Sequence, residues 1–224
     1  MLCALGLWTA LDQSACLQIL VSQPLVASWL AGWIAGDAAS GLAAGVLLQG
    51  VWSRALPLGA SPLPFIGPAA VVGGALAAAS PGPRVVVGHA LAIPEALPLA
   101  IALWMSILVG EVGRPLLQQI YRRRGAIVSL AVREAEGGHF SGVRRAHLLG
   151  MVPTGGLGVS LVALGLLLGT ALFHVVPSFH GDGRWVALPV LGIGVGQACS
   201  LLLKRRAWIW GAAALVLGLL VALI

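Results

Sequence analysis

Charge is the scarcest property of this 224-residue sequence, because only 9% of its residues are Asp, Glu, Lys or Arg. Average soluble domains carry about 25% charged residues, so the chain lacks the side chains for a water-facing surface. It has only three cysteines, with neither a CxxC spacing nor a histidine at metal-ligand spacing, which argues against a metal site. It also lacks a glycine-rich phosphate loop followed by lysine, so neither a nucleotide site nor a cofactor is predicted.

Apolar residues are abundant instead, at 59% of the chain. With a lipid bilayer as solvent, only helix bundles and closed barrels satisfy every backbone hydrogen bond. Barrel strands alternate apolar and polar residues over about ten positions. The apolar runs here are continuous and rich in Leu, Ala and Gly. The sequence therefore predicts an all-α polytopic membrane protein.

The net charge of +6 comes largely from basic clusters within 122–145 and at 204–206. Each cluster lies beside a long apolar run, which is typical of cytoplasmic loops under the positive-inside rule. Basic and aromatic residues do not interleave, so nucleic-acid binding is not predicted. We expect residues 121–147 to lie in the cytoplasm and the chain to cross the plasma (inner) membrane several times.

The C-terminal region, residues 150–224, has apolar runs long enough for three regular transmembrane helices. They are predicted at 150–173, 186–203 and 207–224. The preceding region, 121–149, is predicted as a cytoplasmic basic loop that contains an amphipathic segment broken at Gly137-Gly138. From the residues alone, a short surface helix and a solvated loop are both open there.

The N-terminal region, residues 1–120, is as apolar but is interrupted by polar, Pro and Gly residues. Up to about residue 97 the pieces between the breaks are roughly 10–16 residues long, too short to span a bilayer individually. Interrupted hydrophobic segments are typical of re-entrant helices around a transporter's substrate site. A continuous helix is predicted at 98–120, with Pro115 inside it. Glycines four residues apart, such as Gly32/Gly36 and Gly41/Gly45, predict closely packed helices.

Polar residues inside these apolar pieces are the candidate substrate ligands, because they are costly in a membrane. Asp12 and Gln13 interrupt the first run, either as a cavity-facing pair or as a helix end near the interface. Asp37 precedes a helix start, where an N-cap is the favoured interpretation. Gln49 lies deep in an apolar stretch, where its amide suits either a sugar hydroxyl or an interhelical hydrogen bond.

Two further patterns have simpler interpretations. Glu111 and Arg114 are three residues apart on one predicted helix face, so we expect them to form an ion pair near its cytoplasmic end. Ser61 with His89 could indicate a serine hydrolase, but the strand–turn–helix context and a clear third member are missing. No catalytic residue and no metal ligand is predicted.

Residues 23–76 carry a series of motifs whose order resembles that of the IIC subunits of the mannose/fructose/sorbose family of the bacterial sugar phosphotransferase system (PTS). That family has an Arg-Pro-Leu-Val turn, a Gly-x-x-x-Gly-Asp break, a Thr/Ser-Gly helix start, a Gly-Ala-x-Leu-Glu stretch and Gly-Ala-x-x-x-Pro-Asp. The corresponding segments here are Gln23-Pro24-Leu25-Val26, Gly32 to Asp37, Ser40-Gly41, Gly45 to Gln49 and Gly59 to Phe65. Looser similarity continues at Pro98 to Arg114 and at Leu188 to Lys204.

The resemblance implies a polytopic permease subunit, not an enzyme, that pairs with a IID subunit in an oligomeric sugar pathway with an elevator-like movement. The phosphocarriers IIA and IIB would bring phosphate, and IIB would phosphorylate the sugar at the cytoplasmic mouth. The predicted substrate-binding residues are Asp12, Gln13, Gln18, Asp37, Gln49 and Ser61.

The chain also departs from the family pattern. Gln23, Gln49 and Phe65 stand where the family has Arg, Glu and Asp, and Leu17 and Gln18 fall where it usually carries an acidic residue. These departures support an alternative: a degenerate, non-transporting IIC-like scaffold, or a regulatory component of an incomplete phosphotransferase system.

Overall fold

The structure is a computed structural model that describes residues 1–14, 18–53, 55, 63–87, 91–176, 181–202 and 216, with the backbone alone at 199–202. Its elements are α1 (Leu2–Ser14), α2 (Pro24–Ala35), α3 (Ala38–Val51), α4 (Ile66–Ala79), β1 (Arg84–Val87), β2 (Leu91–Pro94), α5 (Ala96–Arg123), α6 (Gly125–Glu136), α7 (Phe140–Val175) and α8 (Arg184–Leu202). The predicted all-α architecture is confirmed, apart from one short hairpin of strands. The Ser61–His89 pair, the basic turn 204–206 and the span 207–224, except residue 216, lie outside the described residues.

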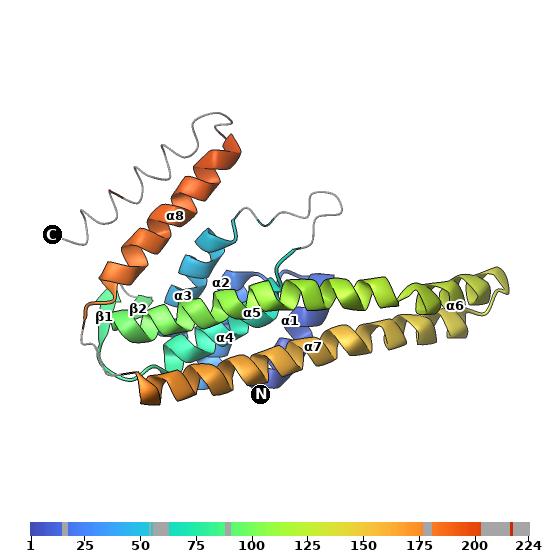
Figure 1. The fold of residues 1–224 in the computed structure, drawn as a ribbon, viewed down its shortest axis with the longest axis horizontal. Coiled ribbons are helices and arrows are strands. Elements are labelled where there is room, and N and C mark those ends of the chain that lie inside the picture. The colour runs from blue at the N-terminus through green and yellow to red at the C-terminus, as the bar shows by residue number, and fades with distance from the viewer. Residues whose placement is uncertain are drawn as a thin grey trace.

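Helix α4 lies at the centre of the molecule and is buried on nearly all sides. Twelve of its fourteen residues, Gly67 to Ala78, are buried. It packs against α1, α2, α3, α5 and α7, and Figure 1 shows it among these helices. A helix that is apolar all round belongs in the core of a protein. Helix α4 therefore forms the core, and the other helices are arranged around it.

Helices α2 and α3 form a hairpin of two short helices packed with their backbones in close contact. Gly36 ends α2 at a φ of +99°, a conformation that glycine adopts without a steric penalty. Asp37 caps α3 by accepting a hydrogen bond from the Ser40 amide, so the predicted N-cap is confirmed. A Cβ added to Gly41 would lie 2.6 Å from the Gly32 Cα atom. The predicted close packing is therefore confirmed at Gly32, Gly41 and Gly45, whereas Gly36 has open space around it.

Within the part of the chain that the structure describes, two helices are long and apolar enough to cross a membrane, α5 and α7. Helices α2, α3 and α4 are apolar but only 12 to 14 residues long, as predicted for the broken N-terminal region. Whether they are re-entrant stays a prediction. Figure 1 shows α5 and α7 running side by side along the long axis of the molecule.

The segment between these two helices is helical, not a solvated loop. Helix α6 follows α5 after Arg124 and ends before Gly137-Gly138, where the break was predicted. Helix α7 then begins at Phe140, ten residues before the predicted start of the span at 150. Figure 1 shows the end of α5, α6 and the start of α7 projecting together from the other helices. We define residues 119–147, which belong to these three helices and their connections, as the arm. The hydropathy pattern locates the apolar part of α7 but not the water-facing turns before it.

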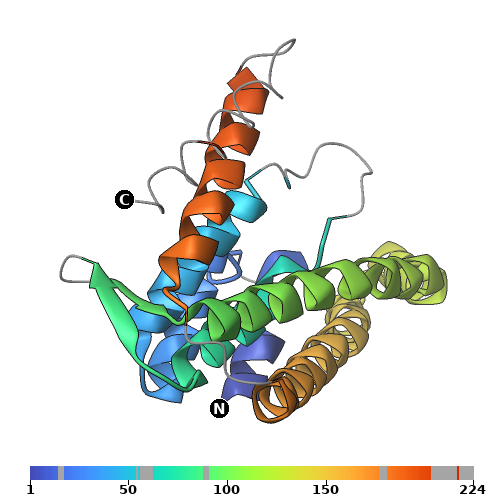
Figure 2. The same cartoon turned by 60° about the vertical axis from the view of Figure 1, so that its left-hand side comes forward.

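The sequence did not predict strands β1 and β2, which form an antiparallel hairpin with Arg84 opposite Pro94. This hairpin lies beside α3 and the start of α5. Helix α8 then crosses α3, where a Cβ on Gly194 would lie 2.7 Å from the Gly50 Cα atom. Figure 2 shows α8 projecting away from the long axis of α5 and α7.

Candidate functional site

A pocket of about 370 Å³ opens where α1, the start of α2 and the end of α3 meet. We call it the polar pocket. Its lining residues are Asp12, Gln13, Gln18, Leu20, Ser22, Gln23, Pro24, Gln49, Trp52, Ser53, Ala55, Leu63 and Ile66. Four of the predicted ligands, from three separate segments, therefore lie around one space: Asp12, Gln13, Gln18 and Gln49.

The last turn of α1 supplies a buried carboxylate that binds backbone amides. Asp12 is 2% exposed. Its two oxygens accept hydrogen bonds from the amides of Ile19, at 2.7 Å, and Ser22, at 2.8 Å. A buried carboxylate requires such donors, because an unpaired charge is costly to desolvate. Asp12 thus organises the turn that forms one wall of the pocket.

Gln13 joins α1 to the start of α4. Its Nε2 donates to the Pro64 carbonyl at 2.8 Å, and its Oε1 accepts from the Gly67 amide at 3.0 Å. The Gly67 amide is near the first turn of α4, where backbone donors have no partner within the helix. The amide N–H and the amide oxygen of Gln13 are therefore both hydrogen-bonded, and they connect α1 to the start of α4 beside the pocket.

The turn that Asp12 holds contains two residues with left-handed backbone conformations. Gln18 has a φ of +46° and Leu20 a φ of +69°, and both side chains are exposed. A non-glycine residue in this region costs about 1–3 kcal/mol and persists only where the surrounding structure holds it. The hydrogen bonds from Ile19 and Ser22 to Asp12 supply that constraint. Such strain is concentrated at ligand sites in proteins.

Gln49 and Gln23 meet at the opposite wall. The Nε2 of Gln49 donates to the Oε1 of Gln23 at 3.3 Å, and the Gln49 Oε1 accepts from the Leu25 amide at 3.4 Å. Both distances are long for hydrogen bonds to oxygen. This pair is therefore held less firmly than Asp12 or Gln13, and a ligand can replace its bonds at small cost.

Sequence reasoning did not name Ser22, Trp52 and Ser53 as ligands, although each lines the polar pocket. Ser22 belongs to the Ser-Gln-Pro break, and Trp52 and Ser53 follow Gln49 by one turn of helix. Their position next to predicted polar residues is the signal that could have found them. They add two hydroxyl groups and an indole to the lining.

Two predicted ligands are not found in this pocket. Asp37 lies at the far end of α2, about 18 Å away for a helix of twelve residues. Its carboxylate forms an ion pair with Arg84 at 2.6 Å, and Arg84 also donates to the carbonyls of Ala78 and Ser80. Ser61 lies outside the described residues.

The polar pocket offers neutral hydrogen-bonding groups: four glutamine amides, two serine hydroxyls and an indole. Its carboxylate, Asp12, is already bonded to two backbone amides. Among the described residues, no group of three or more His, Cys, Asp and Glu could hold a metal ion. Such a surface can bind an uncharged ligand that both donates and accepts hydrogen bonds.

A family model described as "PTS system sorbose-specific iic component" matches residues 1–223. No curated protein and no solved structure matches the chain. The family match covers almost all of the chain, including the short apolar helices and the two long ones. The chain therefore belongs to the family of PTS sorbose-specific IIC components, the membrane permease subunits of sugar phosphotransferase systems.

Proposed function

We propose that this chain binds a sugar in the polar pocket and translocates it together with a IID membrane subunit. The observation that carries this proposal is the convergence of Asp12, Gln13, Gln18 and Gln49 on one pocket. Sugars present several hydroxyl groups, each of which donates and accepts a hydrogen bond. The amides of Gln23 and Gln49 offer both functions from one wall.

The shape of the pocket supports a small polar ligand. Its volume of about 370 Å³ lies at the lower end of the range for ligand pockets, about 300–1,000 Å³. Trp52, which is mostly buried, also lines the pocket, and an indole combines an apolar ring with an N–H donor, which suits a ligand ring with apolar and polar edges. The adjustable Gln23–Gln49 pair gives the ligand a place to enter the hydrogen-bond network.

Phosphorylation of the sugar belongs, in this proposal, to the IIB partner, which receives phosphate from IIA. The protein would lie in the bacterial plasma (inner) membrane as a multi-pass oligomer, with the arm in the cytoplasm. Six arginines against two glutamates in residues 121–147 support that orientation. The surface of α5 and α7 is rich in exposed apolar side chains, as lipid or a second membrane subunit requires.

One observation favours the alternative of a non-transporting scaffold. Asp12 and Gln13 are bonded to backbone groups, and Gln49 is bonded to Gln23. Polar groups that are already paired internally gain less from a ligand than open ones do. Among the lining residues, the Ser53 hydroxyl is buried and has no hydrogen-bond partner in the described part of the chain. The transport proposal requires the hydrogen bond between Gln23 and Gln49 to be replaced by bonds to a sugar, whereas the scaffold alternative keeps it intact.

The test is sugar uptake by vesicles that contain this chain with its IID, IIB and IIA partners. We expect Gln49→Ala to lower uptake at least about tenfold, because a site that bonds a hydroxyl discriminates strongly when a partner is lost. Gln119→Ala removes an exposed glutamine of α5 that does not line the pocket, and should leave uptake unchanged.

Three outcomes separate the alternatives. Uptake that depends on Gln49 and not on Gln119 supports transport through the polar pocket. Uptake that is equal in both variants would place the sugar elsewhere. An assembled complex that neither binds nor transports any sugar supports the scaffold.

A further inference from the structure

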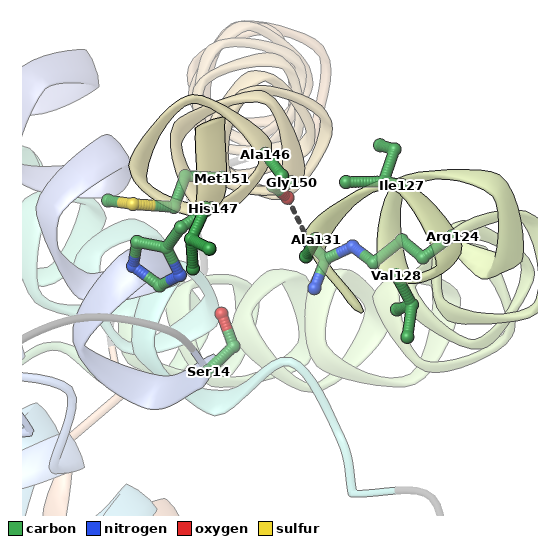
Figure 3. A pocket seen from close by; sticks show the side chains of 10 residues that line it. Ser14, Arg124, Ile127, Val128, Ala131, Ala146, His147, Gly150 and Met151 are labelled. Atoms are coloured by element: carbon green, nitrogen blue, oxygen red, sulfur yellow. Dashed lines mark hydrogen bonds between the residues drawn. The ribbon is translucent and has the colours of Figure 1, made fainter. Parts of the chain in front are cut away.

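A second pocket, of about 390 Å³, lies at the base of the arm between the end of α1, α6 and α7. We call it the arm pocket. Figure 3 shows Arg124 extending into this space from the junction of α5 and α6, with His147 and Ser14 across from it. The lining residues are Ser14, Arg124, Ile127, Val128, Ala131, Val143, Ala146, His147, Gly150 and Met151. None of the predicted sugar ligands belongs to it.

Arg124 is the central polar group of the arm pocket. Its Nη2 donates to the Gly150 carbonyl and to the Thr154 hydroxyl of α7 (Figure 3 shows the first bond). Its guanidinium lies 4.8 Å from the centre of the Tyr121 ring. Its Nε is buried, and no hydrogen-bond partner is found for it among the described residues. A buried donor without a partner is costly, so an anion beside the guanidinium would offset part of that cost.

The charge around this pocket selects an anion. The arm has six arginines and two glutamates between residues 121 and 147. Arg122, Arg144 and Arg145 are exposed, and His147 is exposed at the wall of the pocket. A guanidinium binds phosphate oxygens with paired, charge-assisted hydrogen bonds. A phosphate group therefore matches both the charge and the donor geometry.

The rest of the pocket is apolar. Ile127, Val128, Ala131 and Met151 line it with hydrocarbon, and Val128 is also 57% exposed on the outside of α6. Val132, one turn further along the same face, is similarly exposed. A free phosphate ion gains nothing from such walls, whereas the glycerol and first acyl carbons of a lipid do.

The position along α7 also matches a lipid headgroup. The apolar run of α7 begins at Leu148, directly after His147, and continues for more than the length that crosses a bilayer. The pocket therefore lies at the boundary between the hydrocarbon and the basic, water-facing part of the arm. Anionic lipid headgroups attract basic side chains at this depth of the membrane.

We propose that the arm pocket binds an anionic phospholipid. The phosphate accepts hydrogen bonds from Arg124 and lies near His147. The first acyl carbons pack on Ile127, Val128 and Met151. An acidic segment of a partner protein would also match the charge of this pocket. It would not match the apolar walls at the membrane boundary, so the experiment tests the lipid against it. The bound lipid joins α1, α6 and α7 at the base of the arm.

The experiment is native mass spectrometry of the full chain in detergent, titrated with phosphatidylglycerol or with phosphatidylcholine of the same acyl chains. We expect phosphatidylglycerol to bind about tenfold more tightly, the difference expected of one charge-assisted contact. Arg124→Gln should remove this preference. Arg122→Gln, an exposed arginine of the same arm that does not line the pocket, should keep it.

Because Arg124 also bonds to α7, a second pair of variants tests the pocket without touching this charge. Ala131→Phe fills the pocket and should abolish the preference, whereas Ala126→Phe places the same side chain on an exposed position of α6 outside the pocket and should not. Thermal unfolding without lipid shows whether each variant is folded. Should either test variant fail to fold, His147→Gln, at an exposed position, is expected to lower the preference about threefold, as the loss of a weaker contact does.

Equal binding of both lipids by the wild-type chain would overturn the proposal. So would an unchanged preference in folded Arg124→Gln and Ala131→Phe variants. Displacement of the lipid by millimolar inorganic phosphate would show that the phosphate alone is recognised, and displacement by an acidic peptide would show a protein-docking site. Either displacement contradicts the lipid assignment.

Discussion

The two ends of the α2–α3 hairpin are built from opposite chemistry. At the turn between the helices, Asp37 forms an ion pair with Arg84 at 2.6 Å and caps α3 through Ser40. At the other end, Gln23 and Gln49 are joined by a single amide hydrogen bond of 3.3 Å. The first end is held by several charged bonds and the second by two long neutral bonds, which Gln49 makes with Gln23 and with the Leu25 amide, so only the second can change partners cheaply.

The polar pocket opens at the weakly held end, whereas the charged end has its bonds already made. Arg84 donates to two carbonyls around the end of α4 as well as to Ser40, so it ties the hairpin to the core helix. A binding site needs a scaffold that stays fixed and contacts that can be exchanged. The hairpin supplies the fixed scaffold at its Asp37 end and the exchangeable contacts at its Gln49 end.

The largest effect is expected where the backbones of α2 and α3 lie in close contact, at Gly32 and Gly41. Gly41→Ala places a Cβ 2.6 Å from the Gly32 Cα atom and from the Ser28 carbonyl oxygen. Because these neighbours are backbone atoms, we expect a loss of about 3 kcal/mol in the free energy of unfolding, measured by denaturation in detergent. Gly156→Ala, in α7 with open space around it, is the matched control and should not destabilise.

The charged end should show the next largest effect. Arg84→Ala removes the ion pair with Asp37 and the bonds to Ala78 and Ser80, which should cost about 2 kcal/mol. Arg184→Ala breaks the ion pair with Asp182, which is more exposed, and should cost less than about 1 kcal/mol in the same denaturation assay. Equal losses in the two variants would show that the charged end is not specially fixed.

A smaller loss is expected at the wall of the polar pocket. Asp12→Asn keeps one acceptor oxygen but loses one of the two bonds to the amides of Ile19 and Ser22. We expect a loss of about 1.5 kcal/mol, typical of a hydrogen bond to a charged group. A cysteine introduced at position 20 (Leu20→Cys) should be labelled faster when Asp12→Asn is also present, because the strained turn is then no longer held. An unchanged labelling rate would mean that Asp12 does not hold the turn.

The smallest effect on stability is expected at the weakly held end. Gln49→Ala removes two long hydrogen bonds from a partly exposed side chain, so unfolding should change by less than about 1 kcal/mol. The same variant should lose sugar uptake, as proposed above. A variant that unfolds as easily as Arg84→Ala would show that both ends of the hairpin are structural, and the contrast between them would fail.

The features predicted correctly from the sequence are local ones. The Asp37 cap and the Glu111–Arg114 ion pair, at 2.8 Å, follow from spacings of three residues, where helix geometry alone decides the contact. The short N-terminal helices follow from the same local rules, because Pro and Gly interrupt their apolar runs.

The features that were missed depend on contacts between distant segments. The sequence left Asp12 as either a cavity residue or a residue at a helix end. The structure shows both, because Asp12 lies in the last turn of α1 and lines the pocket. Strands β1 and β2 are four residues each, too short for a period-two pattern to separate them from apolar helix pieces. Arg124 is one of three successive arginines, and its sequence context does not distinguish it from its exposed neighbours.

Helix α7 is one continuous helix from Phe140 to Val175. At 36 residues the helix is about 54 Å long, nearly twice the hydrocarbon thickness of a bilayer. A straight rod of that length that pivots by about 10° at one end moves its other end by about 9 Å. Helix α7 packs on α4 and also continues into the arm, so a small tilt of the helix at α4 becomes a larger displacement at its Phe140 end.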